Sequence, residues 1–496
     1  MWRRIANARL EGTSHGSGPR VAMQRDKGHG VAKRGTHSMA SYFEGARREL
    51  SLEDGSRVAV VGGGPAGAFF AYFLQRLAES SDLELEIDIY EPRLFTHRGP
   101  AGCNHCGGIV SESLVQLLAS EGVNLPTEVV ERGIEAYMLH MDVGSVRIGT
   151  PTDEKRIAGV FRGNGPRGSE RALRVGFDRY LLDLAASSGA NVIRSLVTRV
   201  AWREDRPELE HGGGARTRYD LVALAAGVNS QLLQKGCDAA PGYTFPGTLT
   251  TFICEFHLGR EAIQASLGDA MHIFLLDLPR LEFSSLIPKG DYVTLCVLGH
   301  DVDEALVDAF LAAPEVKRCF PGGKVPELVC HCFPKLNVRP SAQPFADRMV
   351  WIGDCGVARL YKDGIGSAYR MAKAAARTAA FHGISAKDFD AHYGPACRSM
   401  NWDNALARFV FMATTAIQRL RPLRRGVLRM TATEQAREEV FKHMSSVLWD
   451  VFTGSAPYKD VLVRSLHPGF VASLAWNLVA ANTVAFGTHV KGTGHD

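Results

Sequence analysis

The amino-acid sequence predicts an α/β fold with an inserted β-rich part and a helical C-terminal region. Three observations support this prediction. A glycine-rich turn stands between a strand-like and a helix-like segment near residue 60, strand-like runs fill 245–300, and helical patterns prevail after residue 395. The 496 residues correspond to roughly three domains of about 150 residues each. Apolar residues make up 45% and charged residues 22%, which excludes a disordered or fibrous chain.

The first element is a βαβ unit at residues 57–91. The apolar run 57–61 predicts a buried parallel strand, and residues 68–79 predict a helix. Residues 83–90 alternate apolar and acidic side chains, which predicts a second strand that ends at Glu91. This succession of strand, glycine turn, helix, strand and acidic residue predicts a Rossmann-like dinucleotide-binding unit.

The turn of this unit has the spacing G-x-G-x-x-G. The first glycine forms the tight turn, the second lets the backbone approach a pyrophosphate, and the third lets helix and strand pack closely. The helix N-terminus supplies free N–H groups for the phosphates, and a carboxylate at the end of the second strand can accept hydrogen bonds from a ribose diol. The predicted cofactor contacts are Gly62, Gly64, Pro65, Ala66, Gly67 and Glu91.

The remaining elements continue the α/β pattern in chain order. We expect strands at 192–202, 219–226, 248–257, 292–298 and 350–352, helices at 177–188 and 366–382, and mostly helices from Pro395 onward. Residues 470–486 are apolar but contain two asparagines, which favours a buried or interfacial helix over a membrane span.

A second glycine motif follows the strand at 350–352. Gly353-Asp354 is followed by Gly364-Ile365-Gly366 at the start of a helix. Together with the first motif, this resembles the flavoprotein group that includes p-hydroxybenzoate hydroxylase. The resemblance implies bound FAD, with the aspartate on the ribityl chain and the helix N-terminus facing the flavin. A helix N-terminus stabilises the negative charge of a reduced flavin by about 0.3–2 kcal/mol. The implied cofactor contacts are Gly353, Asp354, Gly364, Ile365 and Gly366.

Two further motifs extend the resemblance over residues 57–385. The run 219–227, followed by Ser230, resembles the strand and glycine turn that precede a serine in these flavoproteins. Arg174 with Phe177-Asp178 resembles their Arg-x-x-Phe-Asp helix start. The resemblance implies that Gly227 and Arg174 also contact FAD.

Cys106-Gly107-Gly108 narrows the resemblance to the geranylgeranyl reductase family, whose members carry a Cys-Gly-Gly element near the flavin. All three residues are therefore predicted cofactor contacts, and Cys106 is a candidate catalytic acid or substrate gate. Cys103 is an addition to the family pattern. Three other interpretations remain open: a redox Cys103–Cys106 pair with a lowered thiol pKa, a zinc site shared with the C-x-C spacing at 330–332, or inert packing. We predict no metal cofactor.

The sequence departs from the family in two places. Phe283 is aromatic, but Ser285 stands where an aromatic residue is expected, before an intact Pro-Lys-Gly-Asp at 288–291. Flavin halogenases have two tryptophans in this place, so their absence argues against halogenation, and the less aromatic wall makes a standard prenyl substrate uncertain. Tyr361 stands where the family usually has proline. The following Lys362 is a candidate catalytic residue that could neutralise a reduced flavin or could simply face solvent.

The family resemblance implies a reaction. We expect an FAD-dependent oxidoreductase that reduces C=C bonds of an isoprenoid or another hydrophobic substrate by hydride transfer from reduced flavin. A single dinucleotide fingerprint is present, so the electron donor is either NAD(P)H that docks transiently or ferredoxin. The alternatives are an FAD-dependent monooxygenase that hydroxylates an aromatic or lipid substrate, and a catalytically idle flavin- or metal-binding scaffold at a membrane.

The expected domain organisation is discontinuous. The FAD-binding, p-hydroxybenzoate-hydroxylase-like domain comprises 56–135, 165–245 and 330–390, the substrate domain comprises 136–164 and 245–330, and the helical C-terminal region comprises 391–496. Residues 1–50 form a basic tail that we expect to be disordered. The tail is a leader, the product of a start site that should be Met39, or an organelle transit peptide.

Charge and cysteine usage limit the location and the partners. The net charge is +4, but the segment 1–38 contains eight Lys/Arg and two Asp/Glu, so the rest is slightly acidic and does not indicate nucleic-acid binding. Ten cysteines do not make a disulfide scaffold, which favours a cytoplasmic protein. The segment 417–429 contains five arginines and no acidic residue. It could lie on an anionic membrane surface or form an exposed helix face.

Overall fold

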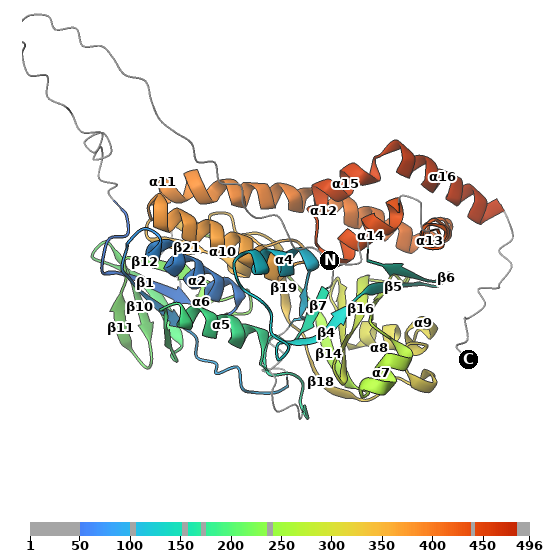
Figure 1. Ribbon diagram of the computed structural model, residues 1–496, viewed down its shortest axis with the longest axis horizontal. Coiled ribbons are helices and arrows are strands. Elements are labelled where there is room, and N and C mark those ends of the chain that lie inside the picture. The colour runs from blue at the N-terminus through green and yellow to red at the C-terminus, as the bar shows by residue number, and fades with distance from the viewer. Residues whose placement is uncertain are drawn as a thin grey trace, which may run out of the picture. The chain divides into compact units, whose positions relative to one another are not determined.

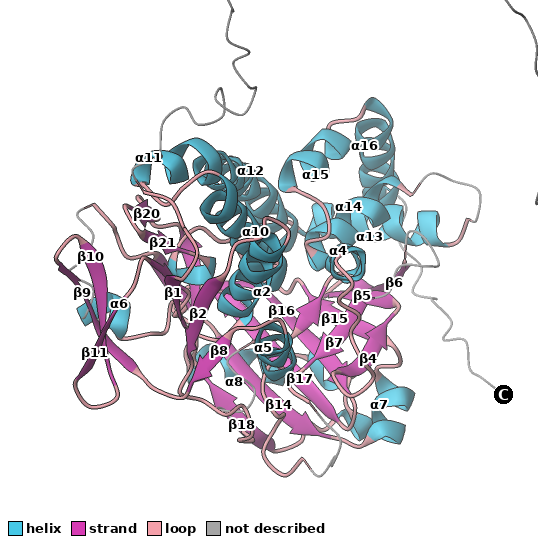
Figure 2. Ribbon diagram, turned by 60° about the vertical axis from the view of Figure 1, so that its left-hand side comes forward, coloured by secondary structure: helices cyan, strands magenta, loops and turns pink. Residues whose placement is uncertain are grey.

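Two large sheets and a layer of helices make up the part of the chain that the computed structural model describes (Figure 1, Figure 2). This part comprises residues 50–99, 106–150, 157–169, 175–235, 242–437 and 442–483. All of these residues belong to the unit that spans 48–496. The predicted α/β class, with its β-rich insertion and helical C-terminal region, is confirmed.

The first sheet has the strand order β20-β21-β12-β1-β2-β8 and is parallel except at β20. Its strands are β1 (Ser56–Val61), β2 (Leu85–Tyr90), β8 (Asn191–Ile193), β12 (Leu221–Leu224), β20 (Phe345–Ala346) and β21 (Met349–Trp351). Val60 pairs with Ile89 on one side and Ala223 on the other, and it is completely buried. The apolar run at 57–61 is therefore the central strand of a sheet covered on both faces, as its composition predicted.

Helices cover this sheet on one face and a small antiparallel sheet covers the other. α2 (Pro65–Glu79) packs against α10 (Gly364–Phe381) and α5 (Phe177–Ser187). The small sheet consists of β9 (Val197–Arg203), β10 (Arg206–His211) and β11 (Ala215–Arg218), and α6 (Leu232–Lys235) lies beside it. The prediction of a single strand at 192–202 is wrong. The chain turns at Ser195, whose N–H donates to the carbonyl of Ile193, and it continues as β9 in a different sheet.

The second sheet has the order β18-β14-β17-β16-β15-β5-β6, and only the pair β15–β5 is parallel. Its strands are β5 (Ala136–Met141), β6 (Gly144–Gly149), β14 (Phe252–His257), β15 (Ala270–Phe274), β16 (Leu281–Lys289), β17 (Tyr292–Gly299) and β18 (Leu328–Cys332). The strand predicted at 248–257 is also divided. Its first part, β13 (Gly247–Thr250), pairs with β19 (Lys335–Arg339), because Thr251 bonds to the Pro334 carbonyl and interrupts the run.

Short elements connect and cover these sheets. β3 (Ile109–Val110), β4 (Val130–Ile134) and β7 (Ile157–Val160) form a three-stranded sheet near α4 (Glu112–Ser120). One face of the second sheet packs against a group of short helices, which are α7 (Arg260–Ser266), α8 (Glu304–Ala312) and α9 (Pro314–Lys317). The short helix η1 (Pro321–Gly323) follows α9.

Helices of the C-terminal region lie along one side of both sheets (Figure 2). They are α11 (Ala386–Asp388), η3 (Phe389–Tyr393), α12 (Gly394–Arg419), α13 (Arg421–Gln435), α14 (His443–Thr453), α15 (Tyr458–Ser465) and α16 (Pro468–Thr483). Within the residues described, no helix combines the length and the apolar character that crossing a membrane requires. The basic segment 417–429 is not uniformly exposed, because Arg424 is buried and its Nε lies 2.6 Å from Asp142 Oδ1.

Candidate functional site

A cavity of about 630 Å³ lies between the carboxyl ends of the first sheet and one face of the second. Most residues predicted from the sequence line it, namely Gly62, Gly64, Pro65, Ala66, Glu91, Cys106, Gly107, Gly108, Gly227, Gly353, Asp354, Lys362, Gly364 and Ile365. Gly67 and Gly366 directly follow lining residues. Arg174 and Cys103 lie outside the described residues. Motifs that are far apart in the sequence thus meet at one place.

The glycine turn joins β1 to α2 as the sequence predicted. The N–H of Gly62 donates to the Tyr90 carbonyl at 2.9 Å, which ties the turn to β2. A Cβ on Gly67 would overlap with the carbonyl oxygen of Gly62. The turn can therefore form only because α2 approaches β1 without a side chain between them.

Glu91 is buried, and its carboxylate already has a full set of donors. The N–H groups of Gly63 and Arg93 donate to it at 3.0 and 2.9 Å. The Arg93 guanidinium adds two bonds of 2.9 and 3.1 Å. A carboxylate has about four lone-pair sites, so a ribose diol could bind Glu91 only if Arg93, which is half exposed, moved aside.

An arginine that the sequence analysis missed lies over the glycine turn. Arg162 forms a two-pronged bond with Asp178, in which Nε donates to Oδ1 at 2.9 Å and Nη2 to Oδ2 at 2.8 Å. A Cβ on Gly64 would lie 3.4 Å from Arg162 Nη2, which places the guanidinium beside the α2 N-terminus. The sequence pointed to Asp178 through the Arg-x-x-Phe-Asp motif, but nothing in the spacing identified its partner on the segment that follows β7.

Removal of Asp178 is expected to destabilise the chain strongly. Asp178→Ala leaves the Arg162 guanidinium without its buried partner, which typically costs about 3–5 kcal/mol. Asp183→Ala on the same helix is the matched control, because its pair with Arg179 is exposed and should contribute only about 0.3–0.5 kcal/mol. Urea unfolding of both variants measures the difference, and equal losses would contradict this expectation.

The start of α10 forms the opposite wall. Gly353 has a φ of +67°, and a Cβ there would lie 2.7 Å from that of Ala66, so the two glycine motifs pack against each other. Burial raises the pKa of Asp354, and the charge of Arg162 offsets part of this effect. Gly364, the first residue of α10, has an ordinary φ and no atom within 4 Å of a Cβ. Neither packing nor backbone conformation requires glycine there, whereas a side chain would occupy cavity space.

The loop that carries Lys362 is held by the C-terminal region. Arg359 is buried, donates to the carbonyls of Gly454 and Ala456, and lies 3.6 Å from Asp363. Asn404 accepts from the N–H of Leu360 and donates to the carbonyl of Ala358, both at 2.8 Å. The sequence assigned no role to Asn404, because its partners belong to a distant segment of the chain.

Lys362 lies in the cavity wall. Its Nζ lies 3.8 Å from the centroid of the Phe283 ring. Burial lowers the pKa of Lys362 to about 7, against a smaller opposing effect of the Cys296 thiol. The structure therefore places Lys362 in the cavity wall, and its role toward a flavin stays a prediction. An amine with this pKa can exchange a proton near neutral pH.

Cys106 lines the same cavity, and its Sγ accepts the N–H of Gly108 at 3.4 Å. The redox pair with Cys103 falls outside the described residues. Cys106 does not share a cluster of potential metal ligands with Cys330 and Cys332 within the described part of the chain. Behind this wall lies Lys289 of the Pro-Lys-Gly-Asp segment, which is buried and to which the sequence assigned no role. Its Nζ lies 4.7 Å from the Phe161 ring centroid and has no hydrogen-bond partner among the described residues.

Comparison with known proteins identifies similar folds. No family model matches the chain, and no curated protein matches it. A variant of the flavin-dependent brominase Bmp2 is 16% identical, with a TM-score of 0.56 over 82% of this chain and 98% of its own. The flavin-dependent halogenase CmlS is 18% identical, with a TM-score of 0.53 over 85% of this chain and 72% of its own. A variant of the halogenase PltM in complex with FAD is 12% identical, with a TM-score of 0.57 over 87% and 92%. At these identities the likeness shows a shared fold.

Proposed function

We propose that the chain is an FAD-dependent oxidoreductase that reduces C=C bonds of a hydrophobic, isoprenoid-like small molecule. One observation carries this proposal: a single cavity of about 630 Å³ joins the glycine turn and the α10 N-terminus to the apolar face of the second sheet. Phe283, Ile287 and Leu298 supply that apolar wall. The Cys-Gly-Gly resemblance to geranylgeranyl reductases supports the reaction class, with NAD(P)H or ferredoxin as electron donor.

The residues present fit FAD. The α2 N-terminus and Arg162 offer N–H groups and positive charge to a pyrophosphate, and Asp354, which lines the same cavity, could accept a hydrogen bond from a ribityl hydroxyl. Open space at Gly227 and Gly364 leaves room for a flat ring system against the backbone. When bound, FAD would supply hydride transfer. The α10 N-terminus and the Lys362 ammonium would stabilise negative charge beside it, the apolar wall would exclude water, and Lys362 or Cys106 could deliver a proton to the substrate.

A second candidate is an FAD-dependent monooxygenase that hydroxylates an aromatic or lipid substrate. The fold shared with flavin-dependent halogenases supports this candidate, because one fold serves several flavin reactions. Halogenation itself is not proposed, since Phe283 and Ser285 stand where the resemblance places two tryptophans.

An anaerobic experiment separates these functions. The purified chain is loaded with FAD and treated with NADPH, NADH or reduced ferredoxin without oxygen, and its visible spectrum is recorded before and after addition of prenyl lipids. Bleaching that is reversed by the lipid alone is expected for the reductase. Bleaching reversed only by oxygen would replace it with the monooxygenase. A flavin that no donor reduces would indicate an idle scaffold, and failure to bind FAD would overturn both enzymatic functions.

Substitution of Cys106 tests its role as a proton donor. Cys106→Ala is expected to lower turnover by about 10²-fold or more, the usual contribution of general acid catalysis, with little change in FAD content. Cys254→Ala removes a buried thiol outside the cavity and serves as the control. Full turnover of Cys106→Ala would assign the proton to Lys362 or water.

We also propose peripheral contact with a membrane on the cytoplasmic side, through α12. Trp402, Phe409 and Met412 are all more than half exposed, and their spacing of seven and three positions puts them on one side of the helix. Arg419 and Arg421 are exposed at its end, where each basic residue adds about 1 kcal/mol of attraction to anionic lipid.

Sedimentation with vesicles tests this contact. Wild type is expected to sediment with vesicles that contain phosphatidylserine, and the double change Trp402→Ala, Phe409→Ala should remove most of the binding. Leu328→Ala, which changes an exposed apolar side chain on β18, is the control and should sediment as wild type. Equal sedimentation of the double variant would refute the α12 contact.

A further inference from the structure

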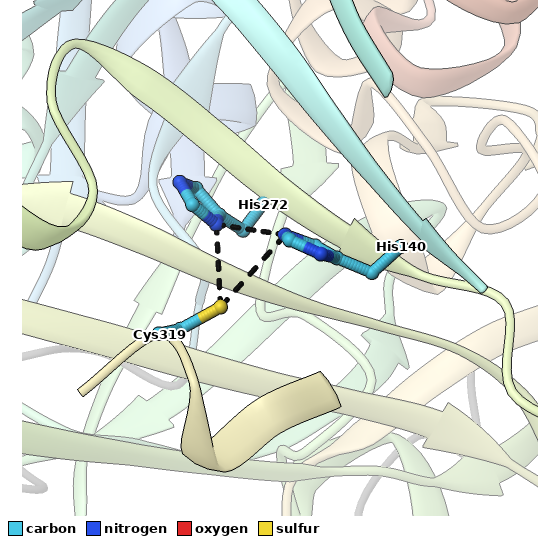
Figure 3. Close-up of side chains that lie close together, drawn as sticks. All are labelled: His140, His272 and Cys319. Atoms are coloured by element: carbon cyan, nitrogen blue, oxygen red, sulfur yellow. Dashed lines mark hydrogen bonds between the residues drawn. The ribbon is translucent and has the colours of Figure 1, made fainter. Parts of the chain in front are cut away.

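Two histidines and a cysteine meet in the core of the second sheet (Figure 3). His140 lies on β5, His272 on β15, and Cys319 follows α9. All three are buried. Because Met271 lines the cavity and neighbouring side chains of a strand point to opposite faces, His272 faces away from the cavity, toward α7–α9. The proposed flavin reaction makes no use of this cluster.

The three inner atoms have the spacing of metal ligands. His140 Nε2 lies 2.9 Å from His272 Nδ1. Cys319 Sγ lies 3.4 Å from His272 Nδ1 and 3.8 Å from His140 Nε2. Tetrahedral zinc with ordinary bond lengths requires about 3.3 Å between two nitrogens and about 3.6 Å between nitrogen and sulfur. Shifts of a few tenths of an ångström would therefore place one ion within reach of all three.

The outer nitrogens of both rings are bound as those of metal-ligating histidines usually are. His272 Nε2 lies 3.1 Å from the carbonyl oxygen of Leu267, which can only accept, so Nε2 carries the proton and the lone pair of Nδ1 points inward. His140 Nδ1 lies 2.7 Å from Ser145 Oγ. That hydroxyl can accept from Nδ1–H, which leaves Nε2 as the inner lone pair. Burial lowers the pKa of His140 to about 3 and of His272 to about 4, and metals bind the neutral ring.

We propose that His140, His272 and Cys319 form a zinc site that joins β5, β15 and the segment after α9. Two imidazoles and a thiol suit zinc, whereas calcium and magnesium require oxygen ligands. On binding, the Cys319 thiol releases its proton to solvent and a water occupies the fourth position. The site joins three segments that are distant in the sequence. The bound ion therefore stabilises the second sheet and the short helices that pack against it.

Metal loading of the full chain tests the site. The chain is treated with a chelator, reloaded with Zn²⁺ alone or Co²⁺ alone, and freed of excess ion. We expect about one tightly held ion per chain, a higher melting temperature with zinc, and a sulfur-to-cobalt charge-transfer band. Cys319→Ala should remove the band and weaken zinc binding by at least about 100-fold. Cys254→Ala removes another buried thiol of the same core. It should leave the charge-transfer band and the zinc affinity unchanged.

A second variant, Ser145→Ala, tests the site in case Cys319→Ala does not fold. Ser145 is exposed on β6, so Ser145→Ala spares the core, and loss of its bond to His140 should weaken zinc binding by about 10-fold. Histidines in the segment 1–38 could also bind Zn²⁺ or Co²⁺. Only ions that are lost in Cys319→Ala or Ser145→Ala are therefore assigned to the proposed site. A wild-type chain that holds neither ion, or ions that neither variant affects, would overturn the proposal and leave a hydrogen-bonded triad.

Discussion

Gly67→Ala is expected to give a chain with sharply reduced stability and no bound FAD. The added Cβ would overlap with the carbonyl oxygen of Gly62 and lie 3.0 Å from Val60 Cγ1. The first contact is with backbone, which cannot rotate away, so α2 must move from β1. Overpacking costs about 1–3 kcal/mol and occasionally more, and a contact with backbone falls at the upper end of that range. The movement of α2 also displaces the N–H groups offered to the pyrophosphate. Urea unfolding and the visible flavin spectrum measure the two losses.

Two other glycines provide matched controls. Gly133→Ala adds a Cβ in open space on β4, away from the cavity, and should change neither quantity. Gly364→Ala also meets no atom within 4 Å, but it faces the cavity. It should retain wild-type stability and lose FAD affinity. Wild-type stability of Gly67→Ala would contradict the packing argument, and unaltered FAD binding by Gly364→Ala would contradict the placement of the cofactor.

Local patterns identified the parts of the site that are contiguous in sequence. The turn at 62–67 and the start of α10 each combine a strand, a glycine motif and a helix, so spacing for the first and the flavoprotein resemblance for the second predicted that both would contribute to one site. The cavity wall at Lys362 was found for a similar reason, since it adjoins a recognisable motif. The sequence predicted that Glu91 would bind a ribose, but the Arg93 guanidinium already occupies acceptor positions of its carboxylate. That contact depends on a side-chain conformation that no sequence pattern encodes.

Features that depend on tertiary contacts could not be predicted. The partner of Asp178 is Arg162, the support of the Lys362 loop comes from Arg359 and Asn404, and each contact joins separate elements without a fixed spacing. Apolar strand runs were located but not their interruptions, because no glycine or proline separates β13 from β14 although they pair in different sheets. The same applies to His140, His272 and Cys319, which come from three distant segments.

Lys362→Met is expected to stabilise the chain without FAD and to weaken its binding of FAD. Burial lowers the folded-state pKa of Lys362 from 10.5 to about 7. Between these values the unfolded chain binds more protons than the folded chain, so the Lys362 contribution to the free energy of unfolding rises with pH. The penalty for burying the ammonium is therefore largest below pH 7. The gain in stability from methionine should be greatest near pH 6 and shrink toward pH 10.

The affinity of the wild-type chain for reduced FAD should fall with pH, whereas the Lys362 contribution to its free energy of unfolding rises. If the Lys362 ammonium attracts reduced FAD, wild-type affinity falls as pH rises through about 7, by at most about tenfold per pH unit. Lys362→Met should bind weakly at every pH, without this slope. Lys387→Met removes an exposed lysine on α11 and should match wild type in both measurements. Denaturant titrations and fluorescence titrations with reduced FAD from pH 6 to 9 test both trends. If Lys362→Met retains the pH dependence of FAD affinity, another group is responsible for that titration. If Lys362→Met is less stable than wild type at pH 6, the ammonium is favourably paired in the folded chain.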